Sequence, residues 1–152
     1  MLQRIQTIYL SLAAICLGLT YAFPFAKYLV GDVEVEFSVY GVANSATDLG
    51  VFFPYYVVVG IGALMPIWAI TQYKKRKNQM KIGRMNYLVL LVTLTFMYID
   101  LEKCTSALGL TEESVEYGAS MFLPAVALLF MFLANRSIKK DEALVKSLDR
   151  LR

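Results

Sequence analysis

The sequence predicts an all-α integral membrane protein: a four-transmembrane-helix bundle with both termini inside, a small β-hairpin in the first periplasmic loop and a cytoplasmic C-terminal helical extension. Composition is the first observation behind this prediction. Of the 152 residues, 58% are hydrophobic and 18% are charged, and the mean hydropathy is +0.55. A soluble domain of this size cannot bury so much apolar surface, because only about half of such a chain is usually apolar. The second observation is that four segments contain no Asp, Glu, Lys or Arg; they are 5–23, 49–73, 85–99 and 118–135.

These segments predict a single membrane domain with helices over about 3–24, 49–75, 83–108 and 112–148. At a rise of about 1.5 Å per residue, the first two are long enough for a hydrocarbon core of about 30 Å. The third reaches the interface only if its helix continues to Glu102. The first also resembles a secretory signal peptide, with Arg4 before an apolar stretch and a tolerable cleavage site near Ala22. We expect it to be retained as a membrane helix.

The basic residues predict the orientation. Thirteen of the fifteen Lys and Arg residues lie before the first segment, between the second and third, or after the fourth, and only Lys27 and Lys103 lie elsewhere. Lys and Arg resist translocation across a membrane, whereas acidic residues have little effect. We therefore expect multi-pass insertion into a bacterial inner membrane, with both termini in the cytoplasm.

The outer loop 25–48 contains the predicted hairpin. Residues 33–40 alternate apolar and polar side chains, and Gly31 separates them from the apolar residues 28–30. A two-stranded sheet is marginally stable alone, so its apolar face needs either the helix ends or a partner protein.

Between and within the later helices, single residues mark the expected ends and bends. Gly109 is expected in the left-handed conformation that ends the third helix, and Thr111 at the N-cap of the fourth. Helices three and four should therefore form a tight hairpin. Pro66 and Pro124 are expected to kink the second and fourth helices.

Residues that usually carry chemistry are scarce. The sequence has no His, which removes the usual general base and the commonest metal ligand. Cys16 and Cys104 are expected to stay unpaired, because they fall on distant parts of the predicted bundle. Asp100, at the outer end of the third segment, is expected to face water. We expect no enzymatic activity, no cofactor and no metal.

The basic inner loop 74–84 is a candidate lipid-contact site. It contains six basic and no acidic residues, which is typical of a topology determinant that touches lipid headgroups. An acidic partner is the alternative; RNA has little support, because no aromatic residues are interleaved, and we expect no nucleic acid. The candidate anionic-lipid contacts are Lys74, Lys75, Arg76 and Lys77.

Candidate protein contacts come from three regions. The first helix has a small residue at every fourth position, which lets another helix approach closely, either within the bundle or on a partner. The hairpin and the cytoplasmic tail 136–152 add apolar side chains, and the tail lies either on the membrane or on a protein. The candidate partner contacts are Gln3, Arg4, Gln6, Ala14, Gly18, Ala22, Val33, Val35, Phe37, Leu144 and Leu148.

The two ends of the sequence, 1–10 and 134–152, resemble those of a known family. It is a family of small four-helix membrane proteins of Bacteroidota, catalogued only as a domain of unknown function. The resemblance covers the whole length and implies a bacterial inner membrane, but no reaction, cofactor or catalytic residue.

These observations favour a non-enzymatic accessory subunit or assembly factor of a larger inner-membrane complex, in contact with the lipid bilayer and other subunits. One alternative is a binder or carrier of lipid or another hydrophobic small molecule, which requires a lipid-sized cavity between helices. A second is a membrane enzyme that uses outer carboxylates such as Asp100 or Glu116.

Overall fold

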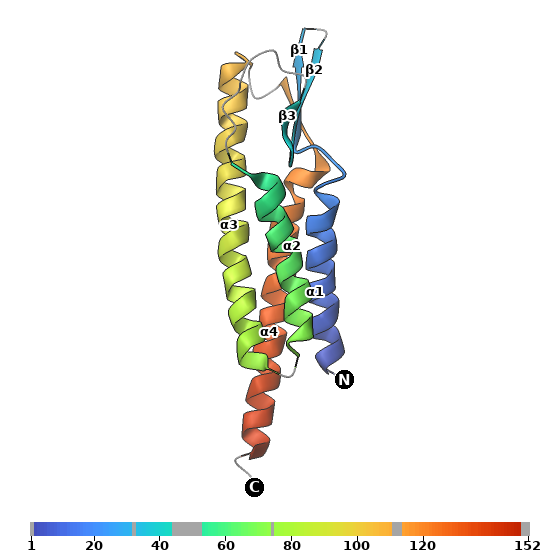
Figure 1. The fold of residues 1–152 in the computed structure, drawn as a ribbon, viewed down its shortest axis with the longest axis vertical. Coiled ribbons are helices and arrows are strands. Elements are labelled where there is room, and N and C mark those ends of the chain that lie inside the picture. Colours follow the sequence, from blue (N-terminus) through green and yellow to red (C-terminus); the bar gives the residue numbers. More distant parts are fainter. Residues whose placement is uncertain (1, 32, 44–52, 74, 111–113, 150–152) are drawn as a thin grey trace.

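The computed structural model describes residues 2–31, 33–43, 53–73, 75–110 and 114–149 (Figure 1). They form four α-helices, a short 3₁₀ helix and one β-sheet. The helices are α1 (Leu2–Leu19), α2 (Tyr55–Thr71), α3 (Arg76–Ala107), η2 (Ala119–Met121) and α4 (Leu123–Asp149). The strands are β1 (Ala26–Val30), β2 (Val33–Ser38), β3 (Gly41–Ala43) and β4 (Val115–Tyr117).

The four helices lie side by side along one long axis, and both termini lie toward the same end (Figure 1). Helix α1 packs against α2 and α4, and α3 packs against α2 and α4. The centre of the bundle is filled by fully buried apolar side chains such as Leu17, Val59, Leu90 and Met131. At the end that carries the termini, α4 projects beyond the other helices.

The antiparallel sheet caps the opposite end of α1 and α2, and the last turns of α3 run beside it (Figure 1). Its strand order is β3-β2-β1-β4. The predicted hairpin is present as β1 and β2, with Tyr28 opposite Val35 and Val30 opposite Val33. Tyr28, Val35 and Phe37 face inward and are buried. The helix ends are thus the surface on which the hairpin packs, which is one of the two surfaces that the sequence allowed.

The outer face of the sheet is charged. The Lys27 ammonium lies 2.7 Å from Glu34 Oε1 and 3.0 Å from Glu36 Oε1. These hydrogen bonds, first to Glu34 and then to Glu36, raise the pKa of Lys27. The alternation of the sequence therefore separates an apolar face on the bundle from a charged face in solvent.

The prediction of an all-α, four-transmembrane-helix bundle is wrong in two respects. First, the connections at one end form a four-stranded sheet. Second, only two helices within the described residues are long and apolar enough to cross a membrane, over Arg76–Ala107 and Ala119–Val145. The other apolar helical segments, Ile5–Leu19 and Tyr55–Thr71, are shorter. The chain leaves α1 after Leu19 to enter the sheet, and α2 begins only at Tyr55. The uncharged segments of the sequence therefore predicted both helices to be longer than they are.

The connection between α3 and α4 also differs from the predicted helical hairpin. Gly109 has φ +64° and ends α3 as predicted, whereas Thr111 lies outside the described residues. Strand β4 then pairs with β1, with Val115 opposite Tyr28. A strand of three residues is too short to show an alternating pattern in the sequence. Strand β4 can therefore be recognised only from its pairing with β1 in the structure.

The starts of α4 and α3 also differ from the predicted positions. Helix α4 begins at Leu123, so Pro124 lies in its first turn, where proline is tolerated, and does not interrupt the helix. Helix α3 begins at Arg76, so most of the basic segment 74–84 is helical rather than loop. Both cysteines are free, as predicted.

Candidate functional site

The buried face of α3 carries a polar side chain at every seventh position. Gln79, Asn86, Thr93 and Asp100 follow this spacing, and each is at most 4% exposed. Seven residues are close to two helical turns, so the four side chains lie on one face. The polar groups differ in how they are satisfied, and this difference distinguishes the two ends of the molecule.

At the sheet-capped end, Asp100 is buried rather than exposed to water as the sequence suggested. Its carboxylate accepts a hydrogen bond from Tyr55 Oη at 2.8 Å and one from Lys103 Nζ at 3.2 Å. Each carboxylate oxygen therefore has a partner, and the half-exposed Lys103 supplies the counter-charge. Sequence alone missed this arrangement because Tyr55 lies on another helix, 45 positions away.

Aromatic rings close the space around this carboxylate. Phe25, Phe37 and Tyr55 pack edge to face, with ring centroids 5.3 to 5.7 Å apart. Phe53 stacks on Phe96 at 4.3 Å. Glu116, the other carboxylate considered for catalysis, is exposed on β4 opposite Lys27. The two acids are thus in separate environments.

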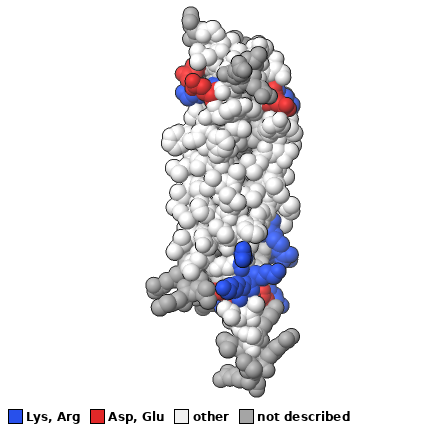
Figure 2. All heavy atoms as spheres, turned by 180° about the vertical axis from the view of Figure 1, so that it is seen from behind, with Lys and Arg blue, Asp and Glu red and all other residues white. Residues whose placement is uncertain are grey.

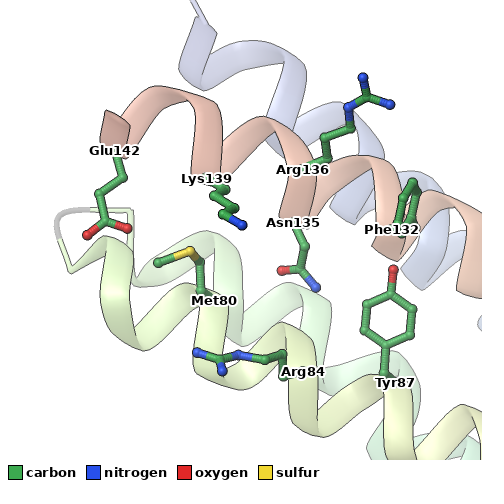
Figure 3. Close-up of a pocket in the computed structure, with 8 residues that line it drawn as sticks. All are labelled: Met80, Arg84, Tyr87, Phe132, Asn135, Arg136, Lys139 and Glu142. Atoms are coloured by element: carbon green, nitrogen blue, oxygen red, sulfur yellow. The ribbon is translucent and has the colours of Figure 1, made fainter. Parts of the chain in front are cut away.

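At the opposite, basic end, a groove of about 620 Å³ lies between α3 and α4 (Figure 3). Its lining is arranged in layers along the helices. The aromatic residues Tyr87 and Phe132 lie toward the middle of the bundle, and the charged side chains, with Met80 among them, lie toward the end. The lining residues are Met80, Arg84, Tyr87, Phe132, Asn135, Arg136, Lys139 and Glu142.

Several hydrogen-bonding atoms in this groove have no partner within the protein. They are the Tyr87 hydroxyl and both amide atoms of Asn135. In Figure 3 the Asn135 amide and the Lys139 amine point from α4 toward α3, and the Tyr87 hydroxyl points toward Phe132. A buried polar atom without a partner costs about 1–3 kcal/mol, so water or a ligand group that reached these atoms would be stabilised there.

Glycine shapes one wall of this site. A Cβ atom on Gly83 would collide with the Asn135 side chain, so the amide can lie against α3 only because residue 83 is glycine. Close approach of two helices at small residues is the usual way that membrane helices pack. Gly83 therefore helps to position the polar floor of the groove.

A polar network ties the helices together beside the groove. Gln6 of α1 donates its side-chain amide to the Asp141 carboxylate, and Arg76 Nη1 donates to the Asp141 backbone carbonyl at 3.0 Å. Gln6 and Asp141 are 6% and 5% exposed. Two residues predicted as external contacts, Gln6 and Arg76, thus make contacts between the chain's own helices.

The remaining predicted contact residues are scattered. Ala14 is half-buried on α1, whereas Gly18 and Ala22 are exposed, and nothing lies within 4 Å of a Cβ built on Gly18. Val35 and Phe37 are buried beneath the sheet, and Val33 is exposed at its edge. Leu144, Lys75 and Lys77 are exposed at the basic end. The side chains of Gln3, Arg4 and Leu148, and all of Lys74, lie outside the described residues.

The sequence analysis did not predict the groove, although the helical spacing of its lining residues is visible in the sequence. Residues 80, 84 and 87 of α3 share one helical face, as do 132, 135, 136, 139 and 142 of α4. What the sequence lacked was the information that these two faces oppose each other. The sequence predicts headgroup contact for the basic segment 74–84, which includes Arg84, but it does not pair that segment with Lys139 of α4.

A second groove, of about 570 Å³, lies between α2 and α3 at the same end. Among the described residues, Lys81 is its only charged lining residue. The other lining residues are Met65, Trp68, Gln72, Asn78, Ile82 and Met85. Among the described residues, none of this lining carries a buried polar atom without a partner.

Comparison with known proteins identifies the family. No curated protein matches the chain. The family described as "Domain of unknown function (DUF4293)" matches residues 2–151, almost the whole length. The chain therefore belongs to the DUF4293 family.

Proposed function

We propose that this chain is a membrane protein that binds a lipid or similar amphipathic molecule in the groove between α3 and α4. The observation that supports this proposal is the groove itself. It is of ligand size, and it combines an apolar layer, unpartnered hydrogen-bonding groups and a basic rim along a single axis. A phospholipid has the same order of chemical groups from acyl chain to headgroup.

Membrane residence is supported by what α3 and α4 expose. Only 28% of the most apolar window of each helix is buried, whereas the core helix of a soluble protein would be mostly buried. The exposed side chains include Leu88, Leu91 and Phe96 of α3 and Leu129 and Phe132 of α4. Figure 2 shows charged residues toward the two ends of the molecule and an uncharged surface between them.

The same surface supports an orientation in the membrane. Apart from Lys27 and Lys103, the described Lys and Arg residues gather at the end that carries the start of α3 and the last turns of α4. Basic segments are retained on the cytoplasmic side of bacterial inner membranes. In our proposal this end, and with it the groove, lies at the cytoplasmic interface, where lipid headgroups and acyl chains meet.

Photocrosslinking tests the proposed binding site. The full chain is purified in a mild detergent with a phosphatidylcholine that carries a diazirine in its acyl chain, and the labelled residues are mapped by mass spectrometry. We expect labels to concentrate around Tyr87 and Phe132. Labels spread evenly over the exposed apolar residues of α3 and α4 would contradict the proposal, because they would report only the surrounding micelle.

Two observations favour a second function, that of an accessory subunit of a membrane complex. The small residue Gly18 is exposed on α1, and Ala22 is exposed just after its end, so a partner helix could approach closely there. In addition, α4 projects past the bundle with Leu144 and Val145 exposed. Gly18→Leu should then abolish co-purification of a specific partner under mild detergent conditions and leave lipid crosslinking unchanged. Unaltered co-purification would count against this role for α1.

A further inference from the structure

We infer that the α3–α4 groove selects lipids with an anionic phosphate headgroup, and that Arg84 and Lys139 bind the phosphate. This inference rests on the proposed function and names the ligand class for the same site. Among the described residues that line the groove, Arg84 and Lys139 are cationic and Glu142 is acidic, and the cationic Arg136 borders the groove with its side chain turned outward. The net positive charge favours a headgroup that carries net negative charge over a zwitterionic one.

The two helices supply the phosphate-binding groups from opposite walls. In Figure 3 the Lys139 amine reaches down from α4 toward α3, and the Arg84 guanidinium lies along α3 beside Met80. Arg136 points away from the groove in this view. An arginine and a lysine on facing helices can both contact one phosphate, with the arginine able to donate two parallel hydrogen bonds.

The depth of the groove matches a lipid headgroup region. Phe132 and Lys139 are seven residues apart on α4, which corresponds to about 10 Å along the axis. Asn135 lies between them, and Tyr87 lies across from Phe132 (Figure 3). The Tyr87 hydroxyl and the Asn135 amide, both buried without a protein partner, therefore lie at the level of the ester oxygens below the phosphate, and Phe132 is placed to contact the start of an acyl chain.

The α2–α3 groove shows that these features are specific to one side of α3. It has a similar volume and lies at the same end, yet it has one cation and no unpartnered buried polar atom within the part of the chain that the structure describes. A lipid there would find apolar contact without a headgroup site. This difference is why we assign charge selection to the α3–α4 groove alone.

A competition experiment tests the inference. The diazirine lipid labels the groove of the full-length protein in detergent, and unlabelled phosphatidylglycerol, phosphatidylcholine or inorganic phosphate is added as competitor. We expect phosphatidylglycerol to compete at a concentration at least about five-fold lower than phosphatidylcholine, and phosphate alone to compete weakly. The double variant Arg84→Gln and Lys139→Gln should weaken competition by phosphatidylglycerol about five-fold relative to phosphatidylcholine, so that the two lipids compete almost equally.

A charge-matched control separates the groove from the general basic surface. Lys75 and Lys77 are exposed and line neither groove, so Lys75→Gln with Lys77→Gln should leave the preference unchanged. Circular dichroism checks that each variant keeps its helices.

The outcomes distinguish the two levels of the argument. Equal competition by both lipids, or a preference that disappears only in the control variant, would overturn the inference while lipid binding in the groove stands. Strong displacement by inorganic phosphate would show that the site binds free phosphate instead of a headgroup. Absence of labelling in the groove would overturn the proposed function as well.

Discussion

The two ends of α3 use buried polar groups in opposite ways. At the sheet-capped end, Asp100 has a hydrogen-bond partner for each oxygen and lies under packed aromatic rings. At the basic end, Tyr87 and Asn135 have buried polar atoms without a protein partner. All the unpartnered buried side-chain atoms among the described residues belong to Asn86, Tyr87, Asn135 and Asp141, toward the basic end. The first end thus satisfies its buried polar groups within the protein, whereas the second leaves some unsatisfied, which is the basis of the proposed lipid site.

Alkaline pH should weaken the sheet-capped end most. Burial, followed by the nearby Cys104 thiol, raises the pKa of Tyr28 to about 12. A raised phenol pKa stabilises the fold fully below about pH 10 and ceases to do so as the pH rises toward 12, with a total effect on the order of 2–3 kcal/mol. We expect the melting temperature to fall across this interval in wild type and to fall less in Tyr28→Phe. Parallel pH profiles would contradict this.

Removal of the Asp100 partner tests whether this end is held by its hydrogen bonds. Tyr55→Phe leaves one oxygen of a buried carboxylate unpaired, which should cost about 1.5–3 kcal/mol of unfolding free energy. Thermal unfolding in detergent measures the loss. Tyr56→Phe is the matched control, because the Tyr56 side chain is exposed and its change should fall within about 0.5 kcal/mol. Equal effects of the two variants would show that the hydrogen bond from Tyr55 to Asp100 does not stabilise this end.

Close packing at the same end can be tested with glycine. A Cβ on Gly118 would collide with the Pro24 backbone carbonyl, so Gly118→Ala should destabilise the protein by about 1–3 kcal/mol. Gly18→Ala is the control in open space within a helix, and it should be neutral or stabilise by about 0.5–1 kcal/mol. The pair is measured by thermal unfolding, and a neutral Gly118→Ala would show that the junction with the sheet is loose.

At the basic end, removal of a buried polar group should stabilise the protein instead of destabilising it. Asn135→Leu removes two unpartnered polar atoms beside the groove. We therefore expect it to increase the unfolding free energy of the lipid-free protein by about 1 kcal/mol, which thermal unfolding would show as a higher melting temperature. The same variant should reduce lipid crosslinking several-fold. A destabilised Asn135→Leu that still binds lipid normally would mean that the amide has a structural role.

Part of this structure was predictable from local sequence. The alternation in 33–40 predicted the hairpin, and Gly109 predicted the end of α3, because strand periodicity and positive φ are properties of neighbouring residues. Strand β4 was not predictable, since three residues have no period and their partner β1 is almost ninety positions away. Asp100 was misplaced for the same reason: its burial depends on Tyr55 from another helix.

The candidate site was also beyond local patterns. The basic residues of the groove were visible in the sequence, and their charge predicted orientation and headgroup contact for segment 74–84, but no groove between two helices. That Arg84 and Lys139 border one space depends on which faces of α3 and α4 meet. Helix-face spacing would have identified the two halves of the site, but not their pairing.

The most direct test of the central contrast uses one chemical change at both ends. Tyr55→Phe and Tyr87→Phe each remove a single buried hydroxyl, one bonded to Asp100 and one without a partner. Thermal unfolding and lipid crosslinking are measured for both. The account predicts that Tyr55→Phe lowers stability and leaves crosslinking intact, whereas Tyr87→Phe leaves stability unchanged and weakens crosslinking. Equal losses of stability with unchanged lipid binding in both variants would contradict it.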